Sequence, residues 1–195
     1  MNRFLILLLV AMAGIIPESR AQKVAVKTNL FYGAYTYTPN LGMELGLGHK
    51  TTLSVGGGYN PWNLDGTYDD NKKLVHWLGE MEFRYWLCQR FTGHFFGIHV
   101  LGAQFNISGH RLPLLFGSDS KNFRYEGYAV GGGITYGYQF ILGKRWNLET
   151  SLGVGYARLN YDKYKCQKCG EKVESEKKNY VGPTNAAVSL IYIIK

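Results

Sequence analysis

Residues 74–88, LVHWLGEMEFRYWLC, alternate strictly between two kinds of side chain. Every second residue from Val75 to Leu87 is apolar or glycine, and the residues between them include Glu80, Glu82 and Arg84. An alternation of period two places the two sets on opposite faces of a β-strand. In a soluble sheet the apolar face would pack in a core, whereas in a membrane barrel it would meet lipid and the charges would face the lumen.

The first residues have the pattern of a secretory signal peptide. Arg3 precedes an apolar run over residues 4–16, and Ser19 and Ala21 are small residues at the positions that a signal peptidase requires. The apolar run is too short for a membrane-spanning helix. We therefore expect residues 1–21 to be cleaved and residues 22–195 to form one exported domain.

The composition also favours a membrane barrel. Aromatic residues make up 15% of the chain, with 15 Tyr and 10 Phe, and there are 25 Gly but only 18% charged residues. Aromatic girdles outside a barrel and small residues inside it account for such a composition. The formal charge of +8 fits affinity for anionic lipid or polysaccharide, or merely solubilising loops. No arginine-rich run or aromatic-basic platform suggests nucleic acid.

The rest of the chain continues the alternation, in eight segments: 23–35, 40–48, 51–60, 74–88, 94–107, 125–142, 146–157 and 179–194. Short connections follow the second, fourth and sixth segments, whereas the connections at 61–73, 108–124 and 162–178 are longer and polar. Short periplasmic turns and longer extracellular loops are typical of outer-membrane barrels. The sequence therefore predicts an all-β fold, an eight-stranded antiparallel up-and-down transmembrane β-barrel with both termini in the periplasm of a Gram-negative bacterium. A soluble all-β domain is the alternative, although it has no reason to alternate its loop lengths.

The alternation predicts a cluster of ionisable side chains inside this barrel. The inward faces carry Lys27, Glu44, Glu80, Glu82, Arg84, His99 and Glu149. The interior of an eight-stranded barrel is just wide enough to be filled by side chains, and isolated buried charges are costly. We therefore expect a lumen salt-bridge network that fills the barrel and fixes its register. A gated ion path or carboxylate catalysis is the other interpretation.

Cys166 and Cys169 form a CxxC motif in the last long connection. Two thiolates at this spacing supply half of a zinc or iron site, and no second CxxC or HxxH motif completes it. His110 on a neighbouring loop, or a partner chain, would have to contribute. A local disulfide, free thiols or a redox function are the alternatives. We otherwise expect no cofactor.

No catalytic motif is evident. No serine, histidine and carboxylate fall together on one face at one height. Gly131, Gly132 and Gly133 lie inside an expected strand with no helix after it, so they do not form a phosphate-binding loop. We interpret them as positions of close packing or bending.

Several motifs carry a resemblance that extends over nearly the whole mature chain: Lys27-Thr-Asn-Leu-Phe-Tyr, Arg84-Tyr-Trp-Leu, Gly97-Ile-His99, Tyr164-Lys-Cys-Gln-Lys-Cys-Gly and Tyr180-Val-Gly-Pro-Thr-Asn. The lumen charges on an eight-stranded frame look like the barrel of the OmpA class. The motifs more closely resemble a family of unknown function, made of small outer-membrane proteins of the Bacteroides group. The genes of that family often lie beside those of fimbrial subunits, which implies an accessory role in assembling or anchoring surface fibres.

Together these features predict a monomeric structural or interaction protein of the outer membrane that acts through its extracellular loops. The expected partners are outer-membrane lipid, lipopolysaccharide and fimbrial or other surface proteins. An enzyme acting on lipid A or surface glycan, or a narrow ion channel, is the alternative.

Overall fold

The computed structural model describes residues 24–62, 72–110, 123–165 and 170–194. It contains eight strands and one short helix in the described part of the chain, in this order: β1 (Val24–Asn29), α2 (Leu30–Thr36), β2 (Asn40–Gly46), β3 (Thr51–Asn60), β4 (Lys73–Trp86), β5 (Gly93–Ser108), β6 (Phe123–Ile141), β7 (Trp146–Lys165) and β8 (Lys172–Ile193). Each strand pairs antiparallel with its neighbours in sequence, and β1 pairs with β8 to close the ring. The predicted eight-stranded, antiparallel, up-and-down barrel is thus confirmed.

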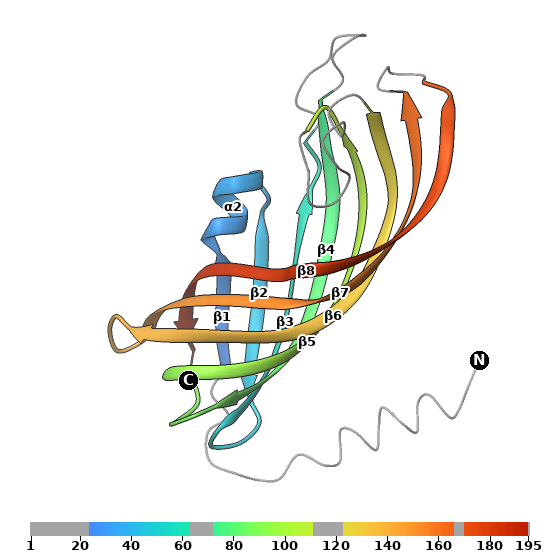
Figure 1. The fold of residues 1–195 in the computed structure, drawn as a ribbon. Coiled ribbons are helices and arrows are strands. Elements are labelled where there is room, and N and C mark those ends of the chain that lie inside the picture. Colours follow the sequence, from blue (N-terminus) through green and yellow to red (C-terminus); the bar gives the residue numbers. More distant parts are fainter. Residues whose placement is uncertain (1–23, 63–71, 111–122, 166–169, 195) are drawn as a thin grey trace, which may run out of the picture.

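The strands differ greatly in length, from 6 residues in β1 to 22 in β8. β1 pairs with β8 only over residues Ser189–Ile193 of β8, so most of β8 continues past the end of β1. Strands β4 to β8 therefore rise well beyond the closed ring as one curved sheet (Figure 1). We call this part, from Leu159 of β7 and Lys178 of β8 outward, the projecting sheet.

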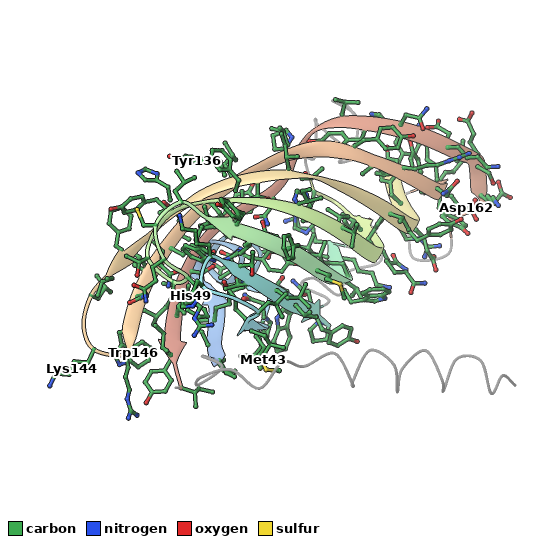
Figure 2. All side chains as sticks on the ribbon, turned by 90° about the horizontal axis from the view of Figure 1, so that it is seen from below. Met43, His49, Tyr136, Lys144, Trp146 and Asp162 are labelled. Atoms are coloured by element: carbon green, nitrogen blue, oxygen red, sulfur yellow. The ribbon has the colours of Figure 1, made fainter. Side chains whose placement is uncertain are left out.

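The faces of the strands follow the alternation of the sequence. On β4, Glu82, Arg84 and Trp86 are buried inside the ring, whereas Phe83 and Tyr85 are nearly half exposed on its outside. Side chains such as Met43, Tyr136 and Trp146 point away from the ring (Figure 2). The molecule has an apolar exterior around a polar interior, the reverse of a soluble domain. Within the described ranges, no helix is long and apolar enough to cross a membrane.

The expected strand over residues 23–35 is wrong beyond Asn29, because the chain turns there into helix α2. The Asn29 side chain accepts a hydrogen bond from the Tyr32 amide, as a helix N-cap does, and the Thr36 hydroxyl donates to the Tyr32 carbonyl. Tyr37 then ends the helix in the left-handed conformation at φ 52°. Apolar residues alternate through this stretch by chance, and the capping residues decide its structure.

The expected loop over residues 162–178 is also wrong at both of its ends. Residues up to Lys165 belong to β7 and residues from Lys172 belong to β8, and the two strands pair as far as Tyr164 and Lys172. The polar sequence of these segments does not show the alternation by which strands are predicted. Pairing outside an apolar layer depends on backbone hydrogen bonds rather than on an apolar face. The connections after β2, β4 and β6 are short, as expected.

Candidate functional site

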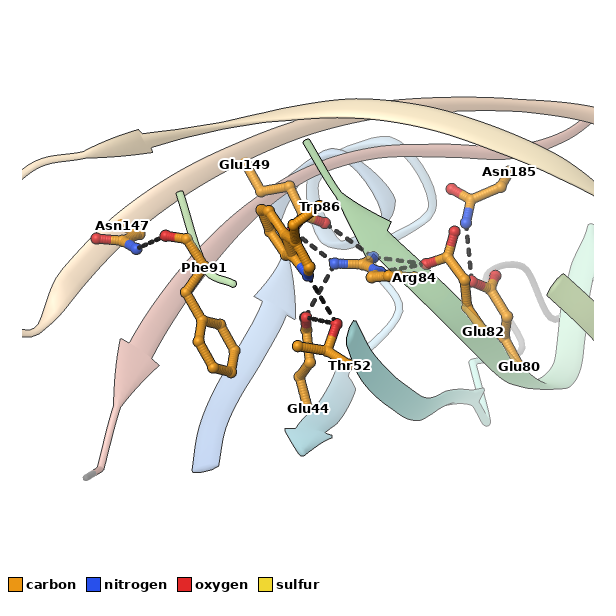
Figure 3. Close-up of polar contacts among 10 residues, drawn as sticks. All are labelled: Glu44, Thr52, Glu80, Glu82, Arg84, Trp86, Phe91, Asn147, Glu149 and Asn185. Atoms are coloured by element: carbon orange, nitrogen blue, oxygen red, sulfur yellow. Dashed lines mark hydrogen bonds and ion pairs between the residues drawn. The ribbon is translucent and has the colours of Figure 1, made fainter. Parts of the chain in front are cut away.

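The interior of the closed ring is organised around Arg84 of β4 (Figure 3). Its Nη1 donates to Glu44 Oε2 at 2.9 Å and to Glu149 Oε2 at 2.7 Å, and its Nη2 donates to Glu149 Oε1 at 3.0 Å. The Glu82 carboxylate accepts a further bond from the guanidinium at 2.6 Å. The guanidinium fork can hold several carboxylate oxygens at once, which an ammonium group cannot do as well. We call these four residues the Arg84 cluster.

The closure of the barrel brings together the strands that carry the four side chains of the Arg84 cluster. Glu44 lies on β2, Glu82 and Arg84 on β4, and Glu149 on β7. All four residues are at most 1% exposed. The cluster therefore ties opposite walls of the ring together, and a slip of any strand by one residue would turn its charged side chain outward.

Aromatic and polar side chains surround the Arg84 cluster on the side of the short turns. The Phe95 ring lies 4.4 Å from the guanidinium carbon of Arg84, a cation–π contact. Trp86 packs on Phe95 at 4.8 Å between ring centroids, and its Nε1 donates to Thr52 Oγ1 at 2.9 Å. The Thr52 hydroxyl in turn donates to Glu44 at 2.6 Å.

The turn between β4 and β5 places Phe91 against this cluster. Phe91 has a positive φ of 63° and is 3% exposed, and its ring lies 6.1 Å from that of Trp86. Asn147 of β7 donates to its carbonyl oxygen at 3.1 Å. Together Trp86, Phe91 and Phe95 form an aromatic plug at this mouth of the ring.

The remaining interior residues expected from the sequence, Lys27, Glu80 and His99, lie beside the Arg84 cluster. Glu80 accepts a hydrogen bond from Asn185 Nδ2 at 2.8 Å. Lys27 and Glu80 both line an interior cavity of about 90 Å³, which has room for a few water molecules. His99 bonds to Thr135 at 2.8 Å and to Thr184 at 2.9 Å. The structure thus brings Arg84 together with three of the four expected carboxylates. His99 lies opposite Glu82 in the pairing of β5 with β4, and Lys27 and Glu80 line the cavity beside the cluster.

An apolar cluster fills the inner face of the sheet farther out. Its buried members are Phe105, Ile107, Tyr125, Ala157, Leu159 and Tyr161. The aromatic plug thus closes the ring on the side of the short turns, and the apolar cluster covers the inner face of β5, β6 and β7 farther out. Such an arrangement stabilises one register of the barrel, which is the chemical role that the contacts support.

Sequence reasoning missed the aromatic plug and the amide and hydroxyl partners. The alternation did place Trp86 on the charged face of its strand, which was a signal for an interior aromatic residue. Phe91 carries no such signal, because it belongs to a turn. Asn185 and Thr52 lie on inward faces, but their partners depend on which strands the closure of the ring brings together.

Cys166 and Cys169 lie outside the described residues, so the expected disulfide, thiol or metal site at this motif stays a prediction. Within the described ranges, no three His, Cys, Asp or Glu side chains are placed to hold a metal ion. Cys88 is exposed in the turn between β4 and β5. Burial lowers the pKa of His110, and the charge of nearby Lys72 lowers it further.

The fold and its interior define the class of this protein as a closed antiparallel β-barrel with a charge-paired lumen. The chain matches a family described as "Protein of unknown function (DUF3575)" over residues 4–194 and belongs to that family. No curated protein and no solved structure matches it.

Proposed function

We propose that this protein is an outer-membrane barrel, closed to solutes, that anchors a protein-binding surface outside the cell. The observation that carries the proposal is the combination of a filled interior with a sheet that projects from one end of the ring. A filled interior leaves no route for a substrate, so the exposed surface of the projecting sheet is the part that can engage another molecule.

The exterior of the ring supports the membrane location. Large apolar side chains are exposed on every described strand from β2 to β8, for example Leu41 at 66%, Ile98 at 67% and Ile134 at 64%. Aromatic side chains such as Tyr59 and Trp146 are exposed nearer to the strand ends. An apolar band bordered by aromatic residues is the surface that a bilayer requires.

The projecting sheet supports the binding role. In the described part of the chain, the edge of β8 that faces β1 has a partner strand only over Ser189–Ile193. Beside the ring, the Asn29 side chain bonds to the Ala186 carbonyl and the Val188 amide of this edge. Farther out, in the projecting sheet, the edge carries backbone donors and acceptors that an extended segment of another protein can pair with. Several lysines at this edge, Lys172 and Lys177 among them, oppose indiscriminate pairing of edges. The resemblance to Bacteroides-group proteins encoded beside fimbrial subunits leads us to propose a fimbrial or other surface protein as the partner.

In-cell photo-cross-linking tests this proposal. A photoreactive residue replaces Lys177, which is exposed on β8, and in a matched strain it replaces Lys144, which is exposed in the short turn between β6 and β7. We expect Lys177 to give one recurrent surface-protein adduct that mass spectrometry identifies, and Lys144 to give none with that protein. Adducts at Lys177 to lipopolysaccharide alone, or equal adducts at both positions, would contradict the binding role.

A conductance measurement distinguishes the channel alternative. Because the Arg84 cluster and the aromatic plug fill the ring, we expect purified protein in planar bilayers to show no single-channel steps. The matched control is a porin of known conductance inserted in the same bilayers. Reproducible conductance steps that disappear when the protein is omitted would instead assign it as a channel.

A further inference from the structure

Helix α2 follows β1 and lies at the end of the ring away from the short turns (Figure 1). Its inner face is polar and bonded to the strands below it. Tyr32 Oη lies 2.6 Å from His76 Nε2, and the carbonyl of Thr36 accepts from Asn60 Nδ2 at 2.8 Å. These bonds link the helix to β3 and β4, while its backbone packs mainly beside β8.

The outer face of α2 is apolar and exposed. Leu30 is 46%, Phe31 49% and Tyr35 72% exposed, and the rings of Phe31 and Tyr35 stack at 5.8 Å. A helix on a soluble protein turns its apolar side to the core and its polar side to water. This helix has the reverse arrangement, the same one that the strands below it have.

A groove of about 920 Å³ runs beside α2, and its lining is uncharged. The apolar and aromatic part of its lining comes from Leu30, Gly33, Ala34, Tyr37, Pro39 and Trp62, and uncharged polar residues complete it: Thr28, Asn29, Thr38 and Asn40. Trp62 is 48% exposed, and its Nε1 donates to the Tyr37 carbonyl at 2.9 Å, which fixes the indole against the helix end. An uncharged groove of this kind suits a hydrocarbon chain rather than a headgroup or a peptide rich in charge.

The strands beneath α2 are too short to cross a bilayer by themselves. β1 has 6 residues and β2 has 7. At about 3.3 Å per residue and a tilt of about 40°, they rise about 15 to 18 Å, less than the apolar band of about 25 Å that membrane barrels present. The lipid-facing wall on this side of the ring is therefore incomplete without another apolar element.

We propose that α2 and Trp62 form the missing part of this wall and hold an acyl chain of an outer-leaflet lipid in the groove beside the helix. The inference rests on the proposed membrane location. The groove opens onto the outer surface of the molecule, because Leu30 and Trp62, which line it, are 46% and 48% exposed. Tyr35, Tyr37 and Trp62 present polar tips on apolar rings, which suits the boundary between acyl chains and headgroups.

Photo-cross-linking in lipid vesicles tests this inference. The full mature chain is refolded into phosphatidylcholine vesicles with a photoreactive diazirine residue at Ala34, which lines the groove, or at Phe31 or Tyr35 on the outer face of the helix. Ile98, which is 67% exposed in the middle of β5, is the lipid-facing control, and Lys177 on the projecting sheet is the water-facing control. We expect covalent phospholipid adducts at Ala34, Phe31, Tyr35 and Ile98 and none at Lys177. Adducts at Phe31 and Tyr35 with none at Ala34 would contradict an acyl chain in the groove.

The outcomes separate the inference from the proposal on which it rests. Adducts at Ile98 with none at Phe31 and Tyr35 would keep the barrel in the membrane and overturn the role of α2. The absence of phospholipid adducts at Ile98 as well would overturn both.

A second measurement uses vesicles of graded acyl-chain length. Replacing Phe31 and Tyr35 together by serine is expected to shift the most stabilising lipid to shorter chains, because the wall on this side becomes lower. An unchanged optimum would contradict the inference.

Discussion

Replacing Arg84 by methionine is expected to cost at least about 3 to 5 kcal/mol of unfolding free energy, the range found when one partner of a buried ion pair is removed. The actual loss is expected at or above the upper end, because Arg84→Met leaves three buried carboxylates without their common cation. Methionine keeps much of the side-chain volume, so the loss reports on charge rather than on a cavity. Urea unfolding of the refolded protein in vesicles, followed by tryptophan fluorescence, measures it.

Two further variants make the Arg84 result specific. Arg145→Met removes an exposed arginine in the turn between β6 and β7, whose Nη1 donates to the Tyr192 hydroxyl at 3.0 Å, and it is expected to change stability by no more than about 0.5 kcal/mol. Adding Glu44→Gln, Glu82→Gln and Glu149→Gln to Arg84→Met is expected to restore part of the loss, because no charge then remains unpaired. If Arg84→Met and Arg145→Met cost the same, the cluster does not hold the barrel together.

The strand alternation was sufficient to predict both the fold and the interior position of Arg84. Its period of two fixes which face of each strand turns inward, and a one-residue error would have put Arg84 and Glu82 outside. Which side chains meet inside the ring depends instead on the stagger of the strands. Thus Glu44 and Glu149, which are far apart in sequence, both bond to Arg84, whereas Lys27 lines the cavity beside the Arg84 cluster.

The alternation does not predict the structure of segments that lie outside an apolar layer, because nothing there requires polar and apolar residues to alternate. Asn29 and Thr36 make the capping and backbone contacts of α2 inside a run that also alternates by chance. In the outer part of β7 and β8, the Ser175 hydroxyl donates a hydrogen bond to Asp162, and Lys172 Nζ lies 2.9 Å from the Asp162 carboxylate. Both faces of that hairpin carry polar side chains, so the period of two is not visible in the hydropathy of the chain.

The glycines of β6 and β7 provide a test of how closely the curved sheet packs. Gly133 of β6 pairs with Gly155 of β7. A Cβ at Gly133 would collide with the carbonyl oxygen of Val154 and lie 2.8 Å from the Cα of Gly155. These are backbone atoms that belong to the neighbouring strand, so the clash cannot be relieved by moving a flexible side chain.

Gly133→Ala is therefore expected to lower the unfolding free energy by about 3 kcal/mol, the upper end of the usual cost of overpacking. Gly102→Ala on β5 is the matched control, because a Cβ there meets nothing within 4 Å. That substitution is expected to be neutral or to stabilise by up to about 1 kcal/mol, since alanine loses less backbone entropy than glycine on folding. Urea unfolding in the same vesicles compares the two variants. The difference between the two variants is the decisive observation: if Gly133→Ala is as harmless as Gly102→Ala, stability does not depend on the close approach of β6 and β7.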